Sequence, residues 1–142
     1  MRFLAGVQDN PIKYNITFKK SFMIRPRVRI WFENDEGWGF GLGLVEILQA
    51  VDRTGSIKSA AVELGRSYRH VWSRIKEAEA ALGRPLAITT VGGRDTRRAE
   101  ITDAARILID EFLAIRDRTI EFMENECVDR LDRLSARSAK ES

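Results

Sequence analysis

The chain has 142 residues, of which 44% are hydrophobic and 32% charged, a composition typical of one globular domain with a charged surface. No apolar run approaches the roughly 20 residues of a membrane helix, and one cysteine and one histidine exclude an internal disulfide, a cysteine metal cluster and most acid–base pairs. We therefore expect a cytoplasmic protein with no membrane contact, no catalytic site, no metal and no cofactor.

The net charge of +3 is unevenly distributed along the chain. Residues 56–101 carry nine Lys and Arg against five Asp and Glu, whereas residues 102–142 carry seven against ten. A basic middle segment favours an anionic partner, although two ordinary solvated faces would give the same counts.

Residues 1–22 show no clean periodicity and are predicted to be a flexible N-terminal arm. Met23 stands just before the first convincing strand, so translation of the native protein could begin there. Basic and apolar residues alternate over residues 27–32, which predicts a half-buried strand.

Glycine then occupies every second position from Gly37 to Gly43, and a strand followed by glycines resembles the start of a nucleotide-binding unit. The third glycine of that fingerprint is missing, and no Gly-Lys-Ser/Thr follows. We therefore interpret Trp38 and Phe40 as side chains packed under the first helix, and not as part of an enzyme's active site.

The hydrophobic period changes to that of a helix from Leu44 onward. The first helix ends at Gly55, and its buried face comprises Leu44, Ile47, Leu48 and Val51. Ser56 caps a short second helix, whose inward residues are Ile57, Ala60, Ala61 and Leu64.

Residues 65–67 form a turn, and a third helix follows until Gly83 and Pro85. Its expected buried stripe comprises Tyr68, Val71, Trp72, Ile75 and Leu82. Two strands are predicted next, over residues 86–90 and 99–101, with a basic, glycine-led loop between them. Thr102 caps a final helix that could continue to Leu134.

This order of elements is that of a winged helix-turn-helix, so the predicted fold is mainly α with a small β-ribbon. It covers residues 23–126, including the long C-terminal helix, and leaves residues 127–142 as a charged tail. Two helices that cross over a tight turn must approach closely, and Ala60 and Ala61 supply small side chains there. Ser67 caps the second of these helices and leaves backbone N–H groups that favour a nearby phosphate.

The outward face of the third helix is basic and polar, with no acid between Arg66 and Lys76. Arginine bonds guanine bidentately, serine and histidine contact bases or phosphates, and Lys76 suits the phosphate backbone. The arginines of the ribbon loop suit a minor groove or the phosphates beside it. The predicted partner is double-stranded DNA, and the predicted DNA-binding residues are Ser56, Lys58, Arg66, Ser67, Tyr68, Arg69, His70, Ser73, Arg74, Lys76, Arg94, Arg97 and Arg98. The alternative is that these side chains form only a solvated surface.

The residues that carry a family resemblance are Gly55–Ile57, Ala60–Ala61, residues 64–69, Val71–Trp72, Leu86, Gly92–Gly93 and residues 101–105. Over roughly residues 25–122 the chain resembles the N-terminal domain of the molybdate-responsive (ModE-type) transcription regulators. Its Ser-Tyr-Arg…Trp signature differs from the Ser-Gln-Pro usual in the related LysR-type regulators. The resemblance implies a winged helix and sequence-specific operator binding.

Two departures from the family limit which of its properties we expect in this chain. Full-length members have C-terminal molybdate-binding domains, for which this chain leaves no space, and residues 94–98 replace a more glycine-rich wing. We therefore expect a regulator that lacks a molybdate site.

Family members dimerise through their terminal helices, which implies the same role for the last helix here. The expected dimerisation residues are Leu108, Phe112, Ile115 and Phe122, although packing on the chain's own core would give the same periodicity. A helix over residues 102–134 would be ~50 Å long, more than a small domain covers, which favours a twofold homodimer. Its DNA half-sites would lie about 34 Å apart, or a multiple of that. The other reading is a winged-helix protein-interaction module, or an auxiliary regulator, that does not bind DNA itself.

Overall fold

The computed structural model describes residues 26–95 and 97–140. The predicted arm, residues 1–22, and the candidate start Met23 lie outside the described residues. The described residues divide into two compact units, one formed by residues 30–114 and the other by residues 115–140 with residues 26–29. All the predicted DNA-binding residues lie in the first unit.

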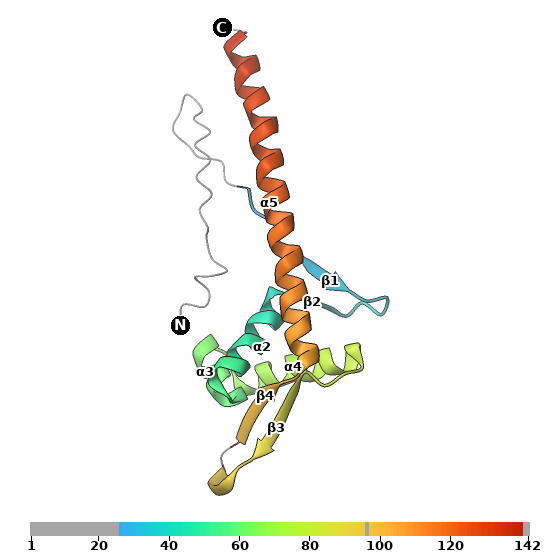
Figure 1. Cartoon of the computed structure of the whole chain (residues 1–142), viewed down its shortest axis with the longest axis vertical. Coiled ribbons are helices and arrows are strands. Elements are labelled where there is room, and N and C mark those ends of the chain that lie inside the picture. The colour runs from blue at the N-terminus through green and yellow to red at the C-terminus, as the bar shows by residue number, and fades with distance from the viewer. Residues whose placement is uncertain (1–25, 96, 141–142) are drawn as a thin grey trace. The chain divides into compact units, whose positions relative to one another are not determined.

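The unit of residues 30–114 has the predicted winged helix-turn-helix fold. Its elements are β1 (Trp31–Glu33), β2 (Gly39–Gly41), α2 (Leu42–Thr54), α3 (Ile57–Leu64), α4 (Tyr68–Leu82), β3 (Ala87–Val91), the 3-10 turn η1 (Gly93–Asp95), β4 (Arg97–Ile101) and the start of α5 (Asp103–Lys140). Helices α2, α3 and α4 lie together, and β3 and β4 extend from them as an antiparallel ribbon (Figure 1). The prediction of a mainly α fold with a small ribbon and a long C-terminal helix is confirmed.

One hydrophobic core joins these helices. The predicted face of α2 is buried, since Leu44, Ile47, Leu48 and Val51 are each at most 1% exposed. Helix α3 adds Ile57, Ala60 and Ala61, and α5 adds Ala105, Ile109 and Phe112. Burial of each large aliphatic side chain contributes about 1.5–3 kcal/mol, so this core fixes how α3 and α4 are presented.

The N-terminal hairpin differs from the sequence prediction. The strand expected over residues 27–32 is reduced to Trp31–Glu33, and residues 26–30 have no regular structure. The alternation of basic and apolar residues is a property of the local sequence, whereas a strand also needs a hydrogen-bonding partner. The described partner of β1 is β2, which has three residues and therefore limits β1 to three. A Cβ on Gly39 would lie 3.0 Å from the carbonyl oxygen of Phe32, so glycine allows this close pairing.

The glycine-rich segment is therefore one strand of a hairpin and not a nucleotide-binding loop. Trp38 stacks on Phe40 with ring centroids 5.6 Å apart, and both pack against the core, as expected. The ring of Phe32 lies 5.8 Å from that of Phe112, and the two are edge to face. The hairpin thus covers the start of α5.

In the second unit, residues 115–140 continue α5. The helix runs beyond Leu134 to Lys140, so it includes most of the predicted tail. No helix within residues 26–95 and 97–140 combines the length and the apolar character needed to cross a membrane.

Candidate nucleic-acid interface

The turn between α3 and α4 is tight and fully hydrogen-bonded. Gly65 ends α3 with φ +63°, a left-handed conformation in which glycine avoids the Cβ penalty. The Arg66 amide donates to the Ala61 carbonyl at 2.9 Å. Ala60 is 0% and Ala61 3% exposed, which confirms the small residues predicted where the helices cross.

Both helices begin with the predicted serine caps. The hydroxyl of Ser67 accepts from the His70 amide at 3.1 Å, and that of Ser56 accepts from the Ser59 amide at 2.9 Å. The first amides of each helix have no acceptor one turn earlier, because a helix cannot supply one there. Both helix starts thus present backbone N–H groups suited to an anion.

The outward face of α4 is exposed where the sequence predicts it. Arg66, Ser67, Arg69 and His70 are all exposed, and Arg66 Nη1 lies 3.4 Å from His70 Nε2. Ser73 is half-buried. This first half of α4 therefore presents donors in several directions, as base recognition in a major groove requires.

The two cations further along α4 are paired with acids of the same helix. Arg74 Nη1 lies 3.1 Å from Glu77, and Lys76 Nζ lies 2.7 Å from Glu79. Each pair must separate, or share its cation, before that cation can contact DNA.

Glu79 also joins α4 to the ribbon. Its Oε1 accepts from the amides of Leu86 at 2.9 Å and Ala87 at 3.1 Å. Burial raises the pKa of this carboxyl, but the hydrogen bonds from Lys76 and from those two amides outweigh it, so the pKa is lowered from 4.5. The ionised carboxylate therefore holds the start of β3 against α4.

We predict that Glu79→Gln lowers the free energy of unfolding by about 1 kcal/mol at pH 7. Because the folded-state pKa is lowered, this stabilisation is present above the unfolded pKa and is lost as the pH falls through the folded pKa. Urea unfolding at neutral pH and below pH 4 would show the difference between variant and wild type shrinking in acid. Glu77→Gln is the matched control, since within residues 26–95 and 97–140 the Glu77 side chain bonds only Arg74. A Glu79→Gln deficit that persists unchanged in acid would contradict the prediction.

The predicted buried stripe of α4 is wrong for three of its five residues. Val71 and Ile75 are buried as expected, but Tyr68 and Trp72 are each 42% exposed and Leu82 is 39% exposed. The third core residue of α4 is Ala78. Tyr68 and Trp72, four residues apart, lie together on a face of α4 next to the core face. Both faces carry apolar side chains, so the hydrophobic pattern alone did not separate the exposed face from the buried one.

Tyr68 and Trp72 line a groove between α4, the start of α3 and the ribbon. Trp72 was not among the predicted DNA-binding residues. The signal that could have found it is its i+4 spacing from Tyr68, which places both aromatic residues on one face.

The ribbon places two of its arginines on opposite faces. Val91 pairs with Arg97 and Thr90 with Arg98. Arg97, Ala99 and Ile101 share one face by alternation; Ala99 and Ile101 are buried at its base, whereas Arg97 is exposed beyond them. The Ala99 amide donates to the Gly55 carbonyl at 2.8 Å, which ties β4 to the turn before α3.

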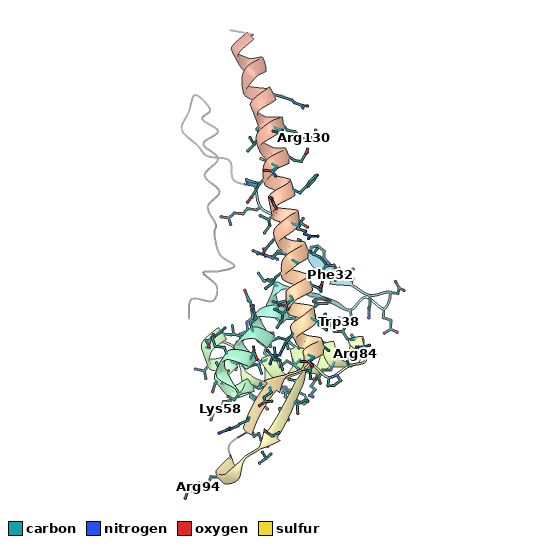
Figure 2. All side chains as sticks on the ribbon, in the orientation of Figure 1. Phe32, Trp38, Lys58, Arg84, Arg94 and Arg130 are labelled. Carbon is teal, nitrogen blue, oxygen red and sulfur yellow. The ribbon has the colours of Figure 1, made fainter. Side chains whose placement is uncertain are left out.

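Arg94 occupies the tip of the ribbon, and Lys58 projects from α3 on the side where the ribbon extends (Figure 2). Arg94 has φ +62°, a left-handed conformation that costs a non-glycine residue roughly 1 kcal/mol or more. Both side chains are exposed. The basic loop is thus an exposed tip, as predicted.

The four expected dimerisation residues fall into two groups. Phe112 is only 3% exposed and Leu108 is partly buried, and both pack in the core of their own chain. Ile115 and Phe122 are 43% and 67% exposed. A dimer contact would therefore depend on Ile115 and Phe122.

The described residues contain no group of three or more His, Cys, Asp or Glu that could hold a metal. The arrangement instead combines an exposed basic helix face, two helix N-termini and a basic ribbon. These are the parts of a surface for a polyanion.

Comparison with known proteins agrees with this geometry. Residues 42–106 match the family model described as bacterial regulatory helix-turn-helix protein, lysR family. Within the matched residues, α3 and α4 are the two helices of the helix-turn-helix, and the ribbon is its wing.

The chain is also similar to curated proteins. The chain is 29% identical over 109 residues to the molybdenum transport protein ModE of Azotobacter vinelandii, covering 77% of this chain and 37% of that protein. It is 35% identical over 79 residues to the molybdenum-pterin-binding protein MopB of Rhodobacter capsulatus, covering 56% of this chain and 29% of that protein. The chain thus spans less than half the length of these relatives. Among solved structures, a complex of the CbnR DNA-binding domain with DNA is 24% identical, covering 68% of this chain and 99% of that chain with a TM-score of 0.43.

The resemblance to ModE-type proteins and to the lysR family is thereby confirmed. The signature residues quoted from the sequence lie at the turn and the first half of α4, within the matched segment.

Proposed function

We propose that this chain is a sequence-specific DNA-binding transcription regulator of the ModE type. The observation that carries the proposal is the exposed first half of α4, where Arg66, Arg69 and His70 face outward with no acid among them. Helix α4 would enter the major groove, with Arg69 bonding a base edge.

The other cations would position the domain on the duplex. Lys58 at the start of α3 and Arg94, Arg97 and Arg98 of the wing are exposed and suited to phosphates or the minor groove. The hydrogen bonds of Ala99 to Gly55 and of Glu79 to β3 hold the wing in a fixed relation to α3 and α4. The reading helix and the wing would therefore dock as one rigid surface.

Fluorescence anisotropy with the full chain and a mixed-sequence duplex of about 30 base pairs tests the proposal. With about five phosphates neutralised by each chain, and so about ten by a dimer, we expect the affinity of the dimer to fall on the order of 10⁵-fold between about 50 and 200 mM salt, because binding releases counterions. Lys58→Ala should reduce the slope of log affinity against log salt by about one for each chain bound.

Absence of binding at low salt, or affinity that does not change with salt, would contradict the proposal. Either result would favour the alternative of a winged-helix module that contacts proteins. The sequence-based expectation that this chain takes up no molybdate stays a prediction, and equilibrium dialysis with molybdate checks it.

We further propose that the protein acts as a homodimer through α5. The exposed apolar side chains Ile115 and Phe122 lie seven residues apart, two helical turns along one face. We predict that Phe122→Arg converts a dimer into a monomer of 16.2 kDa in light scattering, because it places a charge in the contact. Arg130→Ala, at a 73% exposed side chain of the same helix, is the control. A wild-type chain that is already monomeric at working concentration would rule out the proposed homodimer.

A further inference from the structure

The groove between α4 and the wing has an apolar wall. Tyr68 and Trp72 form the side that belongs to α4, and Thr89 and Ala99 lie on the wing side. Trp72 leaves 42% of its surface exposed although it lies directly beside the core residue Val71. Two exposed aromatic side chains side by side in one groove form an apolar patch, and such patches mark sites of interaction with a partner.

Cations line the same groove. Lys58 comes from α3, and Arg97 comes from the face of β4 that carries Ala99. Arg98 and the acid Glu100 also border the groove, from the opposite face of β4. Within residues 26–95 and 97–140, neither Lys58 nor Arg97 has a hydrogen bond or ion pair to another side chain. The backbone amides at the start of α3 open on this groove too, since Ser56 and Ile57 line it.

An occupant of this groove must therefore present anionic groups to the cations and an apolar surface to the aromatic wall. A DNA strand does both, because phosphates alternate with deoxyribose rings whose carbon-bonded faces are apolar. A strand that flanks the major groove occupied by α4 would pass between that helix and the wing.

We propose that this groove holds the sugar–phosphate backbone of one DNA strand, with Trp72 and Tyr68 packed against deoxyribose. Lys58, Arg97 and the α3 amides then bond the adjoining phosphates. Trp72 is thus a positioning residue for the duplex and does not distinguish bases. This inference rests on the proposed function.

The test compares the salt dependence of Trp72→Ala with that of wild type, using the full chain and the mixed-sequence duplex. We expect affinity to fall roughly tenfold at every salt concentration with an unchanged salt slope, because the lost contact is apolar and releases no counterion. Arg97→Ala should instead lower the slope by about one for each chain bound. Trp72→Phe should recover most of the affinity.

Two controls keep the outcome interpretable. Trp31→Ala removes a 58% exposed tryptophan from the β1–β2 hairpin and should bind as wild type does. A duplex with deoxyuracil in place of thymine should show the same Trp72→Ala deficit, because a backbone contact is indifferent to the thymine methyl.

The possible results separate this inference from the proposed function. Wild-type affinity in Trp72→Ala, with DNA bound normally by wild type, would overturn the inference and leave the proposed function standing. A deficit that disappears in the deoxyuracil duplex would replace the backbone contact by a base contact, and would also overturn it. Failure of the wild-type chain to bind any duplex would remove both.

Discussion

Replacing Arg69 by alanine should weaken binding to the preferred duplex by about 1–3 kcal/mol, roughly 5- to 150-fold, while binding to unrelated duplexes changes little. Arg69 is exposed on the first half of α4, where a guanidinium can bond the O6 and N7 atoms of a guanine together. Loss of such a bidentate contact removes discrimination at one base pair. The preferred sequence would first be selected from a pool of random duplexes, and anisotropy would then compare it with single-base variants.

Arg130→Ala removes the same charge from α5, and it should leave sequence preference unchanged. Equal weakening of Arg69→Ala on preferred and unrelated duplexes would assign Arg69 to the phosphate backbone and contradict a role in base recognition.

Phe112→Ala should be the most destabilising single substitution considered, at about 3–5 kcal/mol. The Phe112 ring is 3% exposed and contacts the rings of Phe32 and Phe40, at centroid distances of 5.8 and 6.1 Å. Its loss would open a cavity between the hairpin and the helical core. Because a small domain has only about 5–15 kcal/mol of stability, we expect the midpoint of thermal unfolding to fall by about 10 °C or more.

Ile107→Ala provides the matched control on α5, since Ile107 is 62% exposed and its loss should change stability by no more than about 0.5 kcal/mol. A Phe112→Ala variant as stable as that control would mean that the β1–β2 hairpin does not pack on α5.

Helix ends and the helix-turn-helix were predictable from sequence because each depends on local chemistry. The serine caps at Ser56 and Ser67 and the glycine that ends α3 are set within four residues. The core face of α2 followed from its i, i+3, i+4, i+7 pattern in the same way. The ends of the two wing strands were predicted to within about two residues, because the glycine-led loop between them is also a local signal.

The features that sequence reasoning missed depend on contacts between distant segments. The extent of β1 is decided by its pairing with Gly39–Gly41, which no local pattern contains. The exposure of Trp72 depends on the position of the wing, and the bonds of Glu79 to the amides of Leu86 and Ala87 depend on where the chain returns after α4. Likewise, Phe112 lies in an apolar line shared with Phe122, yet only the former is covered, because the hairpin reaches it.

The central claim is that α4 and the wing together contact duplex DNA, and amide chemical-shift mapping tests it most directly. On addition of a short duplex at low salt, we expect shifts concentrated in residues 66–74 of α4, at the start of α3 and in the wing. Amides of the β1–β2 hairpin should stay in place. Shifts confined to the hairpin or to α5 beyond residue 115, or no shifts at all, would contradict the account.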